Sequence, residues 1–325
     1  MKLAKLYGLV VKYGIRQDPR GEKIAEYFTN IKKKYRKLKT IEKLAFDKES
    51  LSNPFADTRI LYPAPLHRGG AGGEADIEVK KILVGIDIDT AEILLADKIR
   101  DRQGLDLVIA HHPQGLAYAG LSEVMHVQSF ILQKLGLRKD IADNSVKERM
   151  EEVDRRVSPA NHSRAPDAAR LLDMPFMSIH TPADNFVAKY LQELIDKSKP
   201  KNVNDVLKIL SKIPEYKEAF FRKAGPKIIL GKPENKAGKV FVDMTGGTEG
   251  PKELFGRISQ AGVETLVCMH LSEEHFSKAK PEHINVIIAG HIASDNIGLN
   301  LILDKIDSHE KLEIICCSGF KRIRR

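Results

Sequence analysis

Apolar residues between residue 80 and the end of the chain occur in short continuous runs, and amphipathic stretches separate these runs. A run such as 105–110 has the length and composition of a strand that is buried on both faces of a parallel sheet. Strands that alternate with helices predict an α/β fold. The predicted strands cover 82–88, 105–110, 176–179, 227–230, 239–243, 265–269, 286–289 and 312–316, and the predicted helices cover 91–102, 124–135, 145–157, 166–172, 191–210, 251–260 and 293–306.

The first 79 residues follow a different pattern. Residues 21–48 carry one apolar stripe at helical spacing among many lysines, and Asn53-Pro54 ends that stripe. Residues 63–74 are rich in glycine and predict a mobile connecting loop; they lack the Lys-Ser/Thr of a phosphate-binding loop and precede a strand. With Pro200 as a second boundary, we predict a basic helical N-terminal region with a loop (1–79), a first α/β lobe with a helical insertion (80–200) and a second α/β lobe (201–325).

Composition is typical of a globular protein in water. Hydrophobic residues make up 42% and charged residues 30% of the chain. No apolar run approaches the roughly 20 residues that span a bilayer, and no cleavable signal peptide is apparent, so no membrane partner is expected. Cys268, Cys316 and Cys317 form neither a disulfide framework nor a zinc-binding motif, which favours the reducing cytoplasm.

The net charge of +9 suggests nucleic acid as a partner, but the distribution of the charge favours solvated helix faces. Only Tyr35 interrupts the first basic cluster as an aromatic residue, so that cluster lacks a platform for stacked bases and is typical of a solvated helix face. Nucleic-acid binding is therefore the less favoured hypothesis. The basic residues concerned are Lys32, Lys33, Lys34, Arg36, Lys37 and Lys39, and in the tail Lys321, Arg322, Arg324 and Arg325.

The most informative local feature is His111-His112-Pro113, which directly follows the apolar run 105–110. Ligands gather at the carboxyl ends of strands in open α/β sheets. Imidazole is the commonest side-chain ligand of metals, and Pro113 would end the strand. Among 11 histidines in 325 residues such a pair also arises by chance, and two solvated histidines in a loop explain the pair alone equally well.

Two later segments repeat this placement. His180 follows the predicted strand 176–179, and Pro182 suits the start of a helix whose first turn would hold Asp184. His291 follows the strand 286–289 and precedes Asp295 by four residues, so both face the same way if a helix begins at once. Each histidine alone is equally well explained as a hydrogen-bonded structural residue. Several at one edge of a sheet indicate a metal site.

Three imidazoles and two carboxylates are ligands that suit iron, zinc, manganese or cobalt better than calcium or magnesium. Five ligands are too many for one tetrahedral zinc that keeps an open position. Two divalent metal ions about 3.5–4 Å apart, with a carboxylate shared between them, would use all five.

The three motifs, in this order, resemble those of the Nif-three-like (Ngg-interacting-factor, YbgI-type) family of dinuclear-metal proteins, often labelled GTP cyclohydrolase type 2 homologues. That family carries His-His-Pro at a strand end, a later His-Thr-x-x-Asp and a C-terminal Gly-His-x-x-Ser-Glu. The resemblance runs from about Lys80 to Leu303. It implies two packed α/β lobes with a dinuclear metal site in the cleft between them, and subunits assembled into a homohexameric ring.

The resemblance also implies roles for individual residues. By position, His111, His112, Asp184, His291 and Asp295 would be the metal ligands, with Asp295 bridging. His180 would lie beside the metals, and His180 or His275 could move protons. Residues 244–249 look like the family's glycine-rich turn, where the backbone amides of Gly246 and Gly247 could hold a phosphate.

Three departures from the family pattern affect these expectations. Asp295 stands where the family has Glu and is one methylene shorter, so either the backbone lies closer to both metals or one metal binds weakly. Gln114 replaces the usual apolar residue after the proline. Residues 120–174 and the basic N-terminal region are longer than in compact members, which indicates a variant subgroup.

The function that follows is that of a metal-dependent hydrolase, GTP cyclohydrolase-like by resemblance, acting on a nucleotide or a phosphorylated small molecule. A non-catalytic metal-binding regulator or metal-handling protein is the competing hypothesis. A ring that binds nucleic acid through its basic surface is the third.

Overall fold

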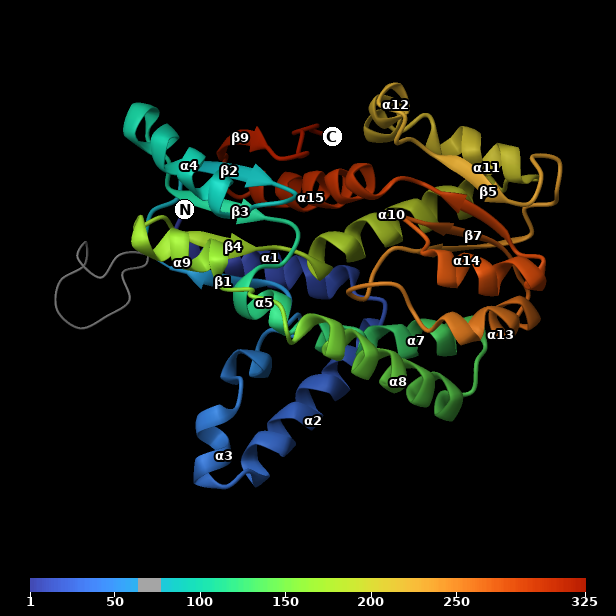
Figure 1. Ribbon diagram of the computed structural model, residues 1–325, viewed down its shortest axis with the longest axis horizontal. Coiled ribbons are helices and arrows are strands. Elements are labelled where there is room, and N and C mark those ends of the chain that lie inside the picture. The colour runs from blue at the N-terminus through green and yellow to red at the C-terminus, as the bar shows by residue number, and fades with distance from the viewer. Residues whose placement is uncertain (64–76) are drawn as a thin grey trace.

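The computed structural model describes residues 1–63 and 77–325, which form two α/β lobes joined by long helices (Figure 1). Both sheets are mostly parallel, so the predicted α/β class with two packed lobes is confirmed. The predicted loop at 63–74 lies, apart from Pro63, outside the described residues. The strands are β1 (Arg59–Tyr62), β2 (Lys81–Gly85), β3 (Leu107–Ala110), β4 (Phe176–Ser178), β5 (Lys227–Leu230), β6 (Lys239–Asp243), β7 (Val263–Cys268), β8 (Asn285–Ile288) and β9 (Glu313–Cys317).

Fifteen α-helices are described around these strands. Several predicted helices are divided: residues 191–210, expected as one helix, are interrupted before Val203, and 124–135 begins with a separate short helix. The helices are α1 (Leu3–Gln17), α2 (Ile24–Lys37), α3 (Thr40–Ala45), α4 (Thr90–Gln103), α5 (Gly115–Ala119), α6 (Leu121–Val124), α7 (His126–Leu135), α8 (Lys139–Val157), α9 (Arg164–Leu171), α10 (Thr181–Ser198), α11 (Val203–Leu210), α12 (Pro214–Phe221), α13 (Phe255–Gln260), α14 (Glu273–Ala279) and α15 (His291–Asp307).

The first lobe is a sheet of five strands in the order β1-β4-β3-β2-β9. Side chains alternate along its central strands because successive residues point to opposite faces. Ile82 and Ile109 pack against α1, α10 and α15, whereas Leu83 and Val108 pack against α4 and α9. All four side chains are fully buried, which explains why these strands are continuous apolar runs in the sequence.

The second lobe is a sheet of four strands in the order β5-β8-β7-β6. One face, with Val242 of β6 and Ile287 of β8, packs against α10, α11 and α15. The other face, with Phe241 and Leu266, packs against α13 and α14. Each lobe therefore has its own core, and α10 and α15 contribute to both.

Helices α10 and α15 lie side by side and connect the lobes (Figure 1). Their close approach depends on Gly298, where an added Cβ would lie 2.4 Å from the carbonyl oxygen of Ala183. The first turn of α10 follows the carboxyl end of β4, and the first turn of α15 follows the carboxyl end of β8.

The two ends of the chain depart from the predicted division into regions. Strand β9, predicted in the second lobe, pairs in parallel with β2 at the edge of the first sheet. Within the region expected to be separate, β1 pairs with β4, and Leu6 of α1 is fully buried in the core of the first lobe. The chain thus enters the first lobe, builds the second, and returns to the first.

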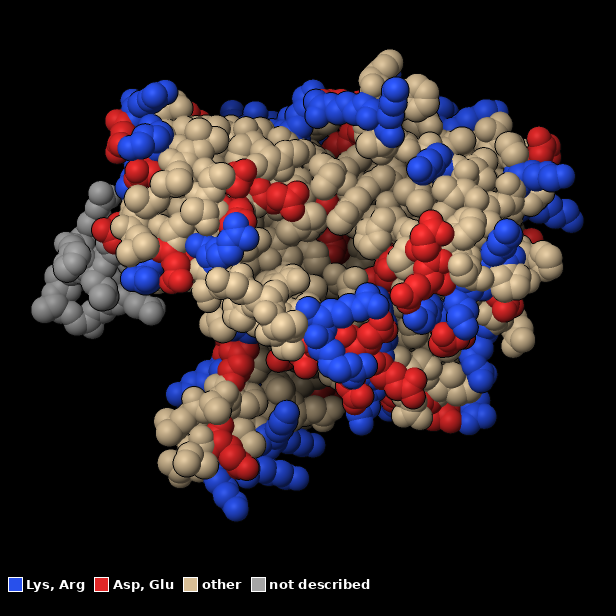
Figure 2. All heavy atoms as spheres, in the orientation of Figure 1, with Lys and Arg blue, Asp and Glu red and all other residues tan. Residues whose placement is uncertain are grey.

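Helices α2 and α3 form an arm that projects from the body (Figure 1). Its basic side chains, including Lys33 and Lys37, are exposed (Figure 2). Of the apolar stripe predicted for 21–48, Ile24 is buried, and Phe28 and Tyr35 are half-buried. Among the helices of the described chain, none has the length and apolar character of a membrane span.

Candidate metal centre

His111 and His112 continue the line of β3 beyond its last residue. The backbone N–H of His111 donates to Gly85 and that of His112 to Ile86, both at 2.9 Å, so the pair is held alongside the end of β2. Because β3 is a central strand, the His111 ring is buried, with 1% of its surface exposed. His112 is only partly covered.

His180 and Asp184 come from the next strand and the helix that follows it. His180 comes directly before α10, and Pro182 lies in the first turn of that helix, as the sequence predicted. Asp184 is in the same first turn, near the positive end of the helix dipole. Both side chains are buried.

His291 is the first residue of α15, so it lies one helical turn from Asp295 on the same side of the helix. Gly290 makes this abrupt start feasible: its φ is +108°, and an added Cβ would lie 2.4 Å from the carbonyl oxygen of Ala224. Asp295 is fully buried.

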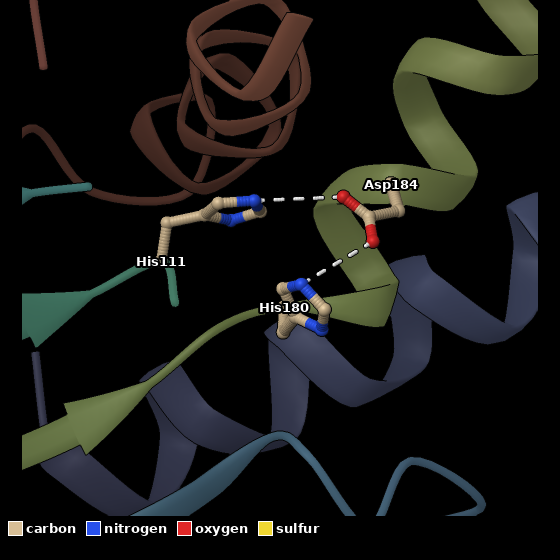
Figure 3. Close-up of side chains that lie close together, drawn as sticks. All are labelled: His111, His180 and Asp184. Atoms are coloured by element: carbon tan, nitrogen blue, oxygen red, sulfur yellow. Dashed lines mark ion pairs between the residues drawn. The ribbon is translucent and has the colours of Figure 1, made fainter. Parts of the chain in front are cut away.

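These elements bring His111, His180 and Asp184 together in a first group (Figure 3). The Nε2 atom of His111 lies 3.5 Å from Oδ1 of Asp184, and the Nε2 atom of His180 lies 3.7 Å from Oδ2. The carboxylate therefore lies between two imidazole nitrogens that come from different strands.

Asp295 occupies an equivalent position in a second group. Its Oδ1 lies 3.4 Å from Nε2 of His111, and its Oδ2 lies 3.4 Å from Nε2 of His112 and 3.6 Å from Nε2 of His291. The Nε2 atoms of His112 and His291 are 3.4 Å apart. The two oxygens of Asp295 thus face different histidines, although Asp is one methylene shorter than the Glu of the family pattern.

Three of these histidines use their Nδ1 atom to contact an acceptor outside the cluster. His111 contacts the carbonyl of Ile179 at 2.9 Å, His112 contacts Asp87 at 2.7 Å and His180 contacts Asp57 at 2.7 Å. Histidines that bind metals nearly always have such a partner, because it fixes the tautomer and leaves Nε2 free.

The sequence analysis did not identify Asp57 and Asp87, the two carboxylates that contact His180 and His112. Asp57 precedes an edge strand of half-buried residues, β1, whose pattern does not predict a strand. Asp87 follows β2 just as His111 follows β3, so its position at a strand end was a signal that went unused.

Several atoms of the cluster are buried without a hydrogen-bond partner in the described part of the chain: Nε2 of His111 and both carboxylate oxygens of Asp295. Leaving buried polar atoms unpaired costs about 1–3 kcal/mol each, and more when they are charged. Within each group the candidate ligand atoms lie within 4.8 Å of one another. Nitrogen and oxygen donors in this arrangement could hold a metal ion.

The pKa values reflect crowding of imidazoles and carboxylates. Burial would lower the pKa of His180, but Asp184 beside it reverses the effect and raises the pKa to about 9. Burial raises the pKa of Asp184 to about 6. Burial would also raise the pKa of Asp295, but His111 holds it well below its usual range. Burial lowers the pKa of His291 to about 4, which leaves its ring neutral.

Of the remaining predicted residues, His275 lines the same cavity as Asp184 and Asp295. His275 is buried with both ring nitrogens engaged, Nδ1 with Ser272 at 2.6 Å and Nε2 with the carbonyl of Gly250 at 2.8 Å. His270, which comes just after β7, has its ring centroid 4.8 Å from that of His291. Its Nδ1 lies 3.4 Å from the carboxylate of Glu249.

Two cavities adjoin the cluster. One, of about 110 Å³, has His180, Asp184, His291 and Asp295 in its wall. The other, of about 350 Å³, reaches His112 and shares His180 and His291 with the first. A small molecule could therefore approach the imidazoles and carboxylates from either side.

Fold and site together define a two-lobed α/β protein with a buried His/Asp cluster that could hold metal ions. Its fold is that of a NIF3 superfamily protein from Sphaerobacter thermophilus, to which the chain is 24% identical with a TM-score of 0.73, covering 98% of this chain and 99% of that chain. This likeness confirms the fold that the motifs predicted, and the chemistry has to be argued from this chain's own residues.

More distant similarity extends to reduced HcgD from Methanocaldococcus jannaschii (18% identity, 78% of this chain and 92% of that chain, TM-score 0.45). It also extends to protein ybgI, described as of unknown function (13% identity, 90% and 97%, TM-score 0.45). No protein-family model and no curated protein sequence matches the chain.

Proposed function

We propose that this chain is a metal-dependent hydrolase that binds two divalent metal ions, of iron, zinc, manganese or cobalt. The observation that carries the proposal is Asp295, which is fully buried with both carboxylate oxygens lacking a hydrogen-bond partner among the described residues. A buried carboxylate is retained in proteins when it is paired or coordinates a metal. Each oxygen of Asp295 faces a different histidine, which supports a shared ligand.

The proposed ligands divide into two sets around this carboxylate. His111 and Asp184 would hold one ion, with His180 beside them, and His112 and His291 would hold the other. Asp295 would contribute one oxygen to each set.

Divalent ions bound here would lower the pKa of a water molecule and polarise the bond to be cleaved. The chain's own contribution is orientation: Asp57 accepts a hydrogen bond from Nδ1 of His180, so Nε2 of that ring faces the cluster. Of the two histidines proposed as proton carriers, His180 has the better position. Both ring nitrogens of His275 are already engaged, Nδ1 with Ser272 and Nε2 with the carbonyl of Gly250.

The residues that line the two cavities give little support to the nucleotide or phosphorylated substrate that the resemblance implies. Among the described residues that line the two cavities there is neither Lys nor Arg. Gly246 and Gly247, proposed as a phosphate cradle, also have a packing role: an added Cβ would lie 2.7 Å from Gln128 and 2.8 Å from Val124, respectively. Both glycines would be required in this turn without any phosphate.

Metal analysis followed by turnover assays tests the proposal. The purified protein is analysed for metal per subunit, and the metal-loaded protein is then assayed on nucleotides, esters and amides. We expect Asp295→Ala and His112→Ala to lose both metal and turnover, while Lys305→Ala, at the far end of α15, retains both. Bound metal without turnover on any substrate favours the metal-handling alternative. DNA binding that depends on salt and survives metal removal favours the nucleic-acid alternative.

Assembly into a hexameric ring and a cytoplasmic location are further proposals that rest on the sequence. The ring rests on the resemblance alone, and sedimentation velocity tests it directly. The location rests on the three cysteines, which are free thiols in the structure.

A further inference from the structure

The smaller cavity extends from the His/Asp cluster into the second lobe, and its two ends differ in chemistry. At one end lie the proposed ligands Asp184, His291 and Asp295. We call the other end the apolar cavity, because aliphatic and aromatic side chains from α7, β6, β7 and α13 form it. These are Ile131, Leu132, Phe241, Phe255, Ile258 and Leu266.

Apart from histidines, the ionisable side chains that line this cavity are mainly carboxylates. Besides the proposed ligands, Asp243 and Glu249 line the cavity, and no Lys or Arg is present among its described lining residues. Asp243 and Glu249 disfavour an anionic group beside them in the cavity, whereas a neutral group meets no such repulsion.

Size sets an upper limit on the apolar group. A dry cavity of about 150 Å³ in another protein accommodates benzene. The cavity here, at about 110 Å³, is of the same order. Because this volume includes the polar end beside the cluster, the apolar end accommodates at most one ring or a short aliphatic chain.

We propose that the substrate of this site carries a neutral apolar group, no larger than about one ring, that occupies the apolar cavity while the bond to be hydrolysed lies at the His/Asp cluster. This inference rests on the proposed function and adds to it the apolar part of the substrate. The continuity of the apolar cavity with the cluster places the bond to be cleaved within reach of the proposed ligands.

A series of hydroxamates tests the apolar group, since the common head binds metals and only the tail varies. Acetohydroxamate, butanohydroxamate and hexanohydroxamate are titrated calorimetrically into the metal-loaded protein. Each methylene buried in an apolar site tightens binding about threefold to fourfold, so we expect the dissociation constant to fall along the series by at least tenfold. Equal affinities for the three compounds would overturn the proposal.

Filling the apolar cavity provides the matched comparison. Ile131→Trp places a larger side chain in the cavity from α7. We expect the hydroxamates to bind this variant with an affinity that no longer increases with tail length, while its metal content is unchanged. Leu94→Trp, on an exposed position of α4 outside both cavities, should retain the full gain. A gain that persists in Ile131→Trp would place the tail elsewhere and refute the inference.

One further measurement separates this inference from the metal hypothesis. Benzene titrated into the protein as purified should give saturable methyl NMR shifts at Leu132 and Leu266, whatever the metal content, and no shifts would refute an accessible apolar cavity. Benzene binding in a protein that holds no metal would contradict the proposed function and still support the apolar cavity as a binding site for an apolar group.

Discussion

Gly298 of α15 lies against the backbone carbonyl of Ala183 of α10, and an added Cβ would be 2.4 Å from that oxygen. The contact lies within one turn of Asp184 on one helix and of Asp295 on the other. The spacing of the two carboxylates therefore depends on a glycine that is not itself a ligand.

We expect Gly298→Ala to destabilise the protein by about 1–3 kcal/mol, because overpacking outweighs the better helix propensity of alanine. It should also weaken metal binding at least tenfold, since α15 must move away from α10. Urea unfolding and competition with a chelator measure the two effects. Gly8→Ala on α1 is the control: nothing lies within 4 Å of its added Cβ, so stability should rise by about 0.5–1 kcal/mol. Unchanged metal affinity in Gly298→Ala would contradict the proposed dependence.

Much of the candidate site was predictable because its residues follow local rules. His111, His180 and His291 each come after an apolar run, and the carboxyl ends of parallel strands meet at one edge of a sheet. Helical periodicity then placed Asp184 and Asp295 near these histidines.

The remainder depends on contacts between segments distant in sequence. Strand β9 has the pattern of any buried strand, and nothing local shows that it pairs with β2 in the first sheet. Asp57 contacts His180 across 123 residues, and β1 beside it is a half-buried edge strand without clear alternation. The proximity of Gly298 to Ala183 likewise requires knowledge of which two helices pack together.

The buried carboxylate of Asp57 should matter more for metal binding than the exposed carboxylate of Asp87. Asp57 contacts Nδ1 of His180 and accepts a hydrogen bond from the hydroxyl of Thr181, and its side chain is fully buried. The Asp87 side chain, which contacts His112, is 70% exposed, so water can replace it. We expect Asp57→Asn to weaken metal binding about 10–100-fold and Asp87→Asn less. Chelator competition on folded protein measures both, and equal losses would argue against the ranking.

The acid sensitivity of the second lobe should depend on Glu249. Burial would raise the pKa of Glu249, but hydrogen bonding to His270 and the nearby His275 outweigh it and lower the pKa to about 2. Its carboxylate also accepts a hydrogen bond from the backbone of Ser272 at 2.6 Å. Because the pKa is lower in the folded than in the unfolded chain, the carboxylate stabilises the fold above about pH 4.5, and this contribution is lost as the pH falls towards 2.

We therefore expect Glu249→Gln to be less stable than the parent protein at pH 7, by about 1 kcal/mol after allowance for solvent screening. The difference should shrink between pH 4.5 and pH 3. Urea unfolding at several pH values measures it. Glu253→Gln removes a carboxylate that is 63% exposed and should show little difference at any pH. If the difference in the free energy of unfolding between Glu249→Gln and the parent protein did not change with pH, the charge of Glu249 would not be its cause.

The number of bound metal ions should distinguish the two buried carboxylates. Asp295 faces His111 with one oxygen and both His112 and His291 with the other, whereas the oxygens of Asp184 face only His111 and His180. We expect Asp184→Asn to lose one ion per subunit and Asp295→Asn to lose both, as measured by elemental analysis of folded protein. Asparagine keeps the size of the side chain and removes the charge, so the two variants differ only in which ligand set is weakened. If Asp295→Asn retained one ion, its carboxylate would not be shared, and the shortened side chain at this position would serve a single metal.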